Sequence, residues 1–170
     1  ETFVRGRTIE ALMDANKKVD RALRAGAMAV GAQVKIQTIP GYMPLQQNKG
    51  MAEVFRANAA ELVGEENMGY VDHRGGSTDM GDLSHIIPAC HPYTAGAVGP
   101  GHSSEYIITD SESAVIVPAK IMAMVVIELL ADGAKLAKEV KANHRPLMTK
   151  QAYIKFQRER AEITDFDGAA

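Results

Sequence analysis

The first third of the chain alternates between two hydrophobic patterns. "QVKIQTIPG" (residues 33–41) sets apolar against polar side chains with a period of two, which predicts a strand ending at Pro40. A second short strand is predicted for Thr2 to Arg7. Between them, from Thr8 to near Gly31, apolar residues recur at helical spacing: Ile9, Leu12, Ala15, Val19, Ala22 and Leu23. The first forty residues therefore predict a β-α-β unit.

A β-α-β unit of this size cannot bury both faces of its sheet. It needs more strands, another domain or a second copy of itself. The unit is therefore expected to be part of a larger assembly.

Helical patterns return after the connector at residues 41–50. Met51, Val54, Phe55, Ala59 and Leu62 predict an amphipathic helix that stops at Gly64. A strongly apolar helix is predicted from Ser113 or Pro118 to Ala131, packed on a sheet, with a shorter piece over 134–142. The polar tail, 144–170, is expected to be helical in its middle and suggests no function. No internal repeat is visible.

Charge and composition exclude several classes of protein. Nineteen basic and twenty-one acidic residues give a net charge of −2 without a basic run, so a nucleic-acid partner is not expected. The longest apolar run, around Ile121 to Ala131, is interrupted by Glu128, so a membrane partner is not expected either. The single cysteine, Cys90, excludes an internal disulfide framework and predicts a cytoplasmic location.

Two polar stretches carry candidate chemistry. In "GPGHSSEY", glycines flank His102 and leave its imidazole unobstructed, which suits a metal ligand or an acid-base group as well as a solvated side chain. In "GGSTDMGD", Ser77, Thr78 or Asp79 is expected to cap a helix. At such a turn the Asp79 carboxylate either orients a neighbouring ligand or substrate, or only caps the helix.

Other titratable residues favour structural roles. His85 and His91 are six residues apart, which does not place them on one helical face, and His73 has no identifiable partner. Cys90 is expected to be a small buried residue rather than a nucleophile. The carboxylates of residues 65–66 follow a helix stop and are expected to be solvated. Neither a G-x-S-x-G elbow nor a P-loop occurs.

Three stretches, "PGYMPLQQN", "GGSTDMGDLSHIIPACHPY" and "GPGHSSEY", together resemble the aminoacylase and carboxypeptidase family of metal-dependent amidohydrolases, metallopeptidase family twenty. The resemblance is greatest to the amidohydrolase branch with p-aminobenzoyl-glutamate hydrolase and the aminoacylase-like dipeptidases. It covers roughly residues 1 to 143, and S-T-D-M-G-D-x-S is its most specific motif.

The resemblance implies an α/β fold that is the C-terminal part of a two-domain metallohydrolase. Residues 1–40 would be the β-α-β end of a lid domain through which two copies form a homodimer. Residues 45–143 would be the closing segment of the catalytic domain, followed by the tail at 144–170. On this basis the chain would be a C-terminal fragment.

The resemblance also implies which residues form the site. His102 matches the family's last metal ligand, for zinc or manganese, and Ser77, Thr78 and Asp79 match a motif that borders the active site. The family's other ligands and its catalytic glutamate pair lie before the lid, and Glu65 follows the lid, so no catalytic residue is expected in this chain. One ligand cannot hold a catalytic metal, which needs about three protein ligands.

The implied activity of the parent protein is metal-assisted hydrolysis of the amide bond in a small N-acyl amino acid or dipeptide. The fragment itself is expected to be inactive. The alternative is a non-catalytic dimerisation or structural module that pairs through its β-α-β remnant.

Overall fold

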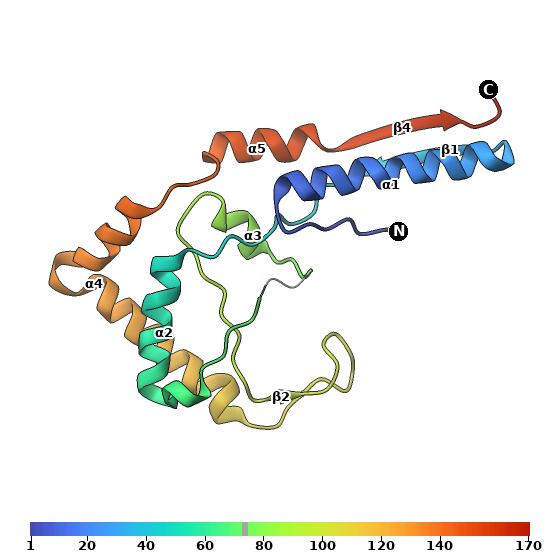
Figure 1. Cartoon of the computed structure of the whole chain (residues 1–170). Helices are drawn as coiled ribbons and strands as arrows, with labels where there is room; N and C mark the ends of the chain where they lie inside the picture. Colours follow the sequence, from blue (N-terminus) through green and yellow to red (C-terminus); the bar gives the residue numbers. More distant parts are fainter. Residues whose placement is uncertain (73–74) are drawn as a thin grey trace. The chain divides into compact units, whose positions relative to one another are not determined.

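A computed structural model describes residues 1–72 and 75–170, and the chain divides into two compact units (Figure 1). Unit 1 contains Glu1–Gln46, Asp72–Ile86 and Pro146–Ala170. Unit 2 contains Gln47–Val71 and Ile87–Arg145. The fold is mixed helix and sheet, as predicted, and each unit is described by itself.

Helix α1 (Ile9–Val30) of unit 1 has the ends that the sequence predicts. The Thr8 hydroxyl accepts a hydrogen bond from the Ala11 amide at the N-terminus. Gly31 takes a left-handed backbone with φ 63° at the C-terminus, where a side chain would be strained. Both ends therefore follow from local sequence chemistry.

Strand β1 (Gln33–Thr38) pairs antiparallel with β4 (Glu162–Asp167), which comes from the tail (Figure 1). The pairing joins Gln33 to Asp167 and Thr38 to Glu162. Ile36 is buried on one face, whereas the other carries an ion pair of 3.8 Å between Lys35 Nζ and Asp165 Oδ1. This two-stranded sheet therefore has one apolar and one polar face.

The strand predicted for Thr2 to Arg7 is wrong, because these residues form no strand. Gly6 lies directly against the first turn of α1: an added Cβ would be 2.5 Å from the Leu12 nitrogen. The segment therefore turns onto the helix instead of extending along β1. The β-α-β unit is replaced by α1, β1 and a strand from the tail.

Two short helices complete the described regular secondary structure of unit 1. Helix α3 (Asp79–Ser84) follows the glycines of the motif stretch. Helix α5 (Lys150–Glu159) confirms the helix expected in the middle of the tail. The tail thus contributes a helix and a strand to this unit.

Unit 2 is built on two helices, α2 (Lys49–Val63) and α4 (Val117–Asn143). Shorter elements are the helical turns η1 (Glu65–Asn67) and η2 (Glu112–Ile116), and a hairpin of β2 (Ala97–Val98) and β3 (Ile107–Ile108). Side chains from α2 and α4 form its core: Val54, Ala59, Ile121 and Val125, surrounded by Phe55, Met68, Val117, Leu129 and Leu136.

Helix α4 departs from the prediction in its packing partner. The apolar helix was expected to lie on a sheet, but in the described part of unit 2 it packs against α2. The strands of this unit are only two residues long, too short to cover a helix of this length. The predicted division of the helix is confirmed, because residues 131–134 have non-helical backbone angles.

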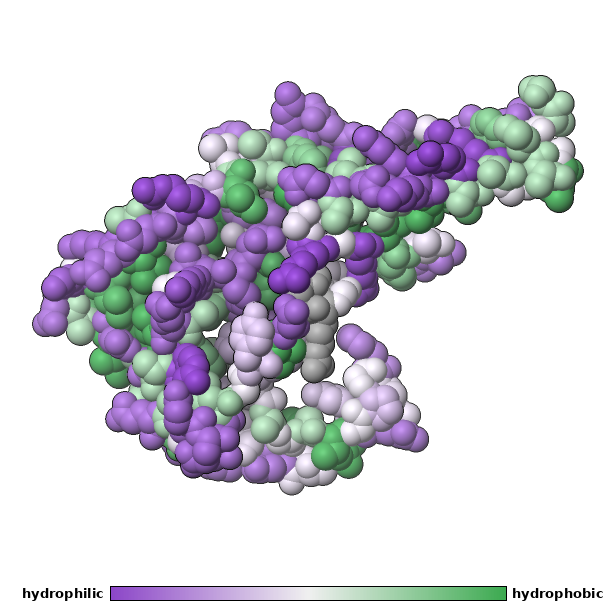
Figure 2. Space-filling view, viewed as in Figure 1, coloured by the Kyte–Doolittle hydropathy of each residue, from purple (hydrophilic) through white to green (hydrophobic). Residues whose placement is uncertain are grey.

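Among the described residues, one helical stretch, Glu112–Asn143, is long and apolar enough to cross a membrane. Its most apolar 18-residue window has a mean hydropathy of 2.2, and 11% of the window is buried. The expectation of no spanning segment rested on the interruption at Glu128, whereas the helix remains this apolar with Lys120 and Glu128 within it. One such helix is weak evidence of a membrane protein, since core helices have the same composition. Figure 2 shows apolar residues on the surface formed by α2 and α4.

Candidate functional site

The motif stretch at residues 77–79 forms the N-terminus of α3. Thr78 is the capping residue, and its hydroxyl accepts a hydrogen bond from the Met80 amide at 3.1 Å. This confirms that a residue of the Ser-Thr-Asp triplet caps a helix. Ser77 and Thr78 are half-buried, whereas Asp79 is exposed. Asp79 makes no hydrogen bond or ion pair with any described residue, so its carboxylate is available to an outside group.

Side chains from α3 hold the connector at residues 41–46 in place. The Asp82 carboxylate accepts from the Met43 amide at 3.2 Å, and the Ser84 hydroxyl accepts from the Gln46 amide at 3.0 Å. Ser84 also donates to the Gly81 carbonyl at 2.6 Å. Two of the three stretches that carry the family resemblance are therefore bound to each other by side chains of the second.

His85 completes this set of contacts. The residue is 0% exposed, and its Nε2 lies 2.8 Å from the Pro44 carbonyl oxygen. A carbonyl only accepts, so Nε2 carries the proton and Nδ1 is left as an acceptor. Nδ1 is buried and has no partner among the described residues. The buried ring therefore supports the structural role expected for His85.

Gly81 explains why the motif contains a glycine inside a helix. A Cβ at this position would lie 1.9 Å from the carbonyl oxygen of Met43. Only glycine allows the two backbones to approach this closely. We call the set formed by Gly81, Asp82, Ser84 and His85 the α3 clamp. The sequence analysis missed it, because its partners in the connector are 38 to 41 residues away along the chain.

His102 lies in the turn between β2 and β3. Its backbone is left-handed, with φ 65°, which is uncommon for a residue with a side chain. The residue is exposed, and its imidazole has no hydrogen-bond partner among the described residues. A strained backbone is typical of functional positions, which agrees with a ring kept free for a ligand.

The surrounding turn explains how this backbone is maintained. The Ser103 hydroxyl donates to the Pro100 carbonyl at 2.8 Å and accepts from the Glu105 amide at 3.2 Å. Gly99 has φ 93°, and a Cβ there would lie 2.2 Å from the Glu105 carbonyl oxygen. The flanking glycine and serine thus set the path of the chain through His102.

The remaining candidate site residues are either bound to other residues of the chain or lie outside the described residues. The backbone of His91 exchanges two hydrogen bonds with the Gln47 side chain, at 2.8 and 3.2 Å. Glu65 forms an exposed ion pair of 2.7 Å with Arg56. Burial raises the pKa of the Cys90 thiol, which disfavours the nucleophilic thiolate. His73 lies outside the described residues.

The described residues do not contain three His, Cys, Asp or Glu side chains placed to hold one metal ion. The predicted ligand, His102, belongs to unit 2, whereas Ser77, Thr78 and Asp79 belong to unit 1. These candidates are therefore not assembled within one unit. The side chains of residues 1–72 and 75–170 therefore do not by themselves fit a catalytic zinc or manganese ion.

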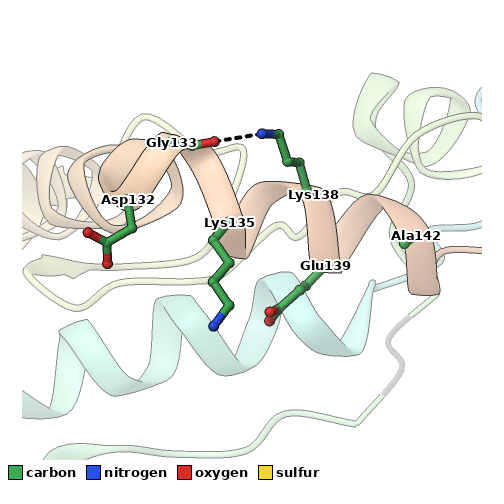
Figure 3. Close-up of a pocket in the computed structure, with 6 residues that line it drawn as sticks. All are labelled: Asp132, Gly133, Lys135, Lys138, Glu139 and Ala142. Atoms are coloured by element: carbon green, nitrogen blue, oxygen red, sulfur yellow. Dashed lines mark hydrogen bonds between the residues drawn. The ribbon is translucent and has the colours of Figure 1, made fainter.

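An open pocket of about 490 Å³ lies at the interruption of α4 (Figure 3). Its lining contains two lysines and two carboxylates, and Lys138 donates to the Gly133 carbonyl at 2.8 Å. None of the predicted site residues lines it. The lining residues are Asp132, Gly133, Lys135, Lys138, Glu139 and Ala142.

The chain is similar to two curated dipeptidases. It is 28% identical to the human (Homo sapiens) Xaa-Arg dipeptidase over 110 residues, which cover 61% of this chain and 25% of that protein. It is 26% identical to the mouse (Mus musculus) Xaa-Arg dipeptidase over 144 residues, which cover 79% of this chain and 33% of that protein. No protein-family model matches the chain, and no solved structure matches it.

The chain thus spans a quarter to a third of the length of the curated relatives it matches. Both relatives are dipeptidases, so this distant homology supports the predicted class of hydrolase at a coarse level.

Proposed function

We propose that this chain is part of a metal-dependent amidohydrolase or peptidase that hydrolyses the amide bond of small N-acyl amino acids or dipeptides. The observation that carries the proposal is the similarity to two dipeptidases, which extends over most of the chain in one of them. The order of the three motif stretches supports the same activity.

In this proposal His102 is a ligand of a zinc or manganese ion. The left-handed backbone and the exposed, unpartnered imidazole support this role. The described side chains do not complete a metal site, so the other ligands and the catalytic base would come from outside this chain. The chain alone would be inactive.

Ser77, Thr78 and Asp79 would contact the substrate or support the residues that do. The exposed Asp79 carboxylate is open to a partner, while Thr78 is committed to its helix. Because both curated relatives are named for dipeptides ending in arginine, such dipeptides are the first substrates to test.

The remaining elements of the proposal concern the parent protein in the cell. It would be a cytoplasmic homodimer formed through the lid domain that includes residues 1–40. Neither nucleic acid nor a membrane would be its partner. The mixed charge of the chain supports the exclusion of nucleic acid.

The first test is the coding sequence that precedes Glu1. The proposal requires a histidine-x-aspartate pair, then an aspartate, then adjacent glutamates before the lid. An open reading frame that starts near Glu1 would contradict the hydrolase proposal for this gene product.

The second test is His102→Gly in a longer protein that contains this chain. Glycine accepts the left-handed backbone, so the variant should fold but lose the bound metal and the hydrolysis of dipeptides. Ser104→Ala, in the same exposed turn, is the matched control and should keep both. Metal content measured by mass spectrometry together with dipeptide hydrolysis decides the question, and a His102→Gly protein that keeps both overturns the ligand role.

A non-catalytic dimerisation or structural module is the second candidate. The lack of a metal-binding set of side chains among the described residues favours it. Sedimentation of the 170-residue chain would detect a dimer, and calorimetric titration with zinc would detect a metal site. A dimer without zinc binding and without upstream ligands in the gene would favour this module over the hydrolase.

A further inference from the structure

The tail is connected to the motif stretch in two ways: the Met148 amide donates to the His85 carbonyl at 3.1 Å, and one side chain of the tail reaches Asp82. Gln157, on α5, donates from Nε2 to the Asp82 carboxylate, with a distance of 3.2 Å to Oδ1. The same nitrogen lies 3.3 Å from the Gly41 carbonyl oxygen and 3.5 Å from the Tyr153 hydroxyl. Gln157 therefore joins three segments of unit 1: the connector, α3 and α5.

Asp82 also binds the connector at residues 41–46. The Oδ1 atom that accepts from Gln157 also accepts from the Met43 amide at 3.2 Å. Met43 is 1% exposed, so an amide that lost this acceptor would be left without a partner in a buried position. The position of Asp82 thus matters to both chain segments.

The other end of the Gln157 side chain is held as well. Its Oε1 accepts a hydrogen bond from the Arg160 guanidinium, which lies over the Phe156 ring at 4.2 Å and within 4.0 Å of the Met13 sulfur. Burial lowers the pKa of Arg160, and the negative charge of Asp82 opposes this shift. A glutamine amide bound at both ends has little freedom to rotate.

Helix α3 cannot set its own orientation. It has six residues, fewer than an isolated helix needs to be stable in water, so its bonds to neighbouring segments must hold it. Asp82 is three residues from Asp79, one turn along the same helix. A shift of Asp82 therefore moves the end of the helix that carries the motif triplet.

We propose that Gln157 is a positioning residue that ties the tail to Asp82 and thereby fixes the α3 clamp and the triplet Ser77, Thr78 and Asp79. The catalytic consequence rests on the proposed function, whereas the structural link does not. This role is separate from the pairing of β4 with β1 and from the backbone bond of Met148 to His85, because neither of them involves Asp82.

The test is hydrogen exchange of backbone amides in the 170-residue chain carrying Gln157→Met. Methionine keeps the length of the side chain but cannot donate, so exchange at Met43 should be about tenfold faster while the β1 amides stay protected. Gln151→Met, on the exposed face of the same helix, should change neither. Unchanged exchange at Met43 in Gln157→Met, or an equal increase in Gln151→Met, overturns the proposal.

A second variant covers the case in which Gln157→Met unfolds the whole unit and exposes β1. Gln157→Asn keeps the amide but is shorter by one methylene, so it should release Met43 with β1 intact. Asp82→Asn preserves the acceptor and should keep Met43 protected, whereas Asp82→Ala should not. Protection of Met43 in Gln157→Asn overturns the proposal.

Catalysis is measured separately in the longer protein. Gln157→Met should lower kcat/KM several-fold at unchanged metal content, whereas Gln151→Met should not. A clear change in exchange at Met43 with full kcat/KM would overturn the catalytic consequence. If the unmodified longer protein has no hydrolase activity, the proposed function fails, while the exchange experiment still decides the structural link.

Discussion

The two units of this chain are held together by different kinds of interaction. Unit 2 has an apolar core between two helices, in which Ile121 is 2% exposed. In unit 1 the largest fully buried side chains are Met43 and His85, and hydrogen bonds of the α3 clamp join His85 and its neighbours to the connector that contains Met43. The Ser77, Thr78 and Asp79 triplet belongs to unit 1, the unit held by hydrogen bonds.

This difference determines how each unit should respond to mutation. An apolar core loses stability in proportion to the volume removed, because dispersion and burial are not directional. Hydrogen bonds and close backbone contacts instead depend on distance and angle, so a shift of a single group can cost several of them at once. In unit 2 the loss of unfolding free energy should therefore grow with the volume of side chain removed. In unit 1 the loss should depend more on which position is mutated than on the volume changed.

The largest effect is expected for Ile121→Ala in unit 2. Removing three buried carbon atoms from a site that is 2% exposed should lower the free energy of unfolding by about 3 kcal/mol. Met122→Ala, at the next position on α4 and 59% exposed, should cost less than about 0.5 kcal/mol. Urea denaturation followed by circular dichroism measures both, and equal losses would contradict an apolar core at this place.

In unit 1 the addition of one methyl group should have a comparable effect. Gly81→Ala places a Cβ 1.9 Å from the Met43 carbonyl oxygen, and the backbones must separate, at a cost of about 2 to 3 kcal/mol. At Gly76 the described residues, apart from its chain neighbours, place no atom within 4 Å of an added Cβ, so Gly76→Ala should be nearly neutral. Hydrogen exchange at Met43 locates the damage, and a neutral Gly81→Ala would show that the clamp is loose.

Local sequence signals predicted the elements whose boundaries depend on local chemistry. Gly31, Gly64, Thr78 and Pro118 mark helix ends as expected, because capping and left-handed backbone are decided within a few residues. The strand at Glu162–Asp167 was missed because the charged residues at 162, 165 and 167 mask its apolar ones. Its partner is more than 120 residues away, and no local pattern specifies that pairing.

The candidate site shows the same division between local and distant causes. The free imidazole of His102 was predictable from the glycines beside it. The α3 clamp was not, since Asp82 and Met43 are 39 residues apart, and Gln157 is 75 residues from Asp82. Of the two carboxylates of α3, Asp82 is thus already bound, whereas Asp79 is exposed.

A smaller, stabilising effect is expected where α4 is interrupted. Ala134 has a left-handed backbone with φ 61°, so Ala134→Gly should raise the free energy of unfolding of unit 2 by about 1 kcal/mol. Ala137→Gly, in the helical part that follows, should lower it by about 1 kcal/mol. Thermal unfolding of the two variants gives opposite shifts in Tm if the interruption is present, and two losses if the helix is continuous.

The smallest expected effects are changes in the pKa of two exposed carboxylates, one in each unit. The Ser113 hydroxyl, 2.6 Å from Asp110, and the Ser113 amide lower the pKa of Asp110 in unit 2. In unit 1 the Ala169 amide and then the Gln33 side chain lower the pKa of Asp167. Because a lowered pKa favours the charged form in the folded state, each contribution is present above the unfolded pKa and lost as the pH falls through the folded pKa.

Ser113→Ala separates these two carboxylates. The variant removes the hydroxyl, which is the largest cause of the shift, so the pKa of Asp110 should rise towards its ordinary value while that of Asp167 stays low. Gln33→Leu should raise the pKa of Asp167 by less, because the Ala169 amide remains as a donor. Titration of the side-chain carboxyl carbons by NMR reports both groups in one sample. If the pKa of Asp167 also rose in Ser113→Ala, the two carboxylates would not titrate independently. The pKa of each could then not be assigned to hydrogen bonds within its own unit.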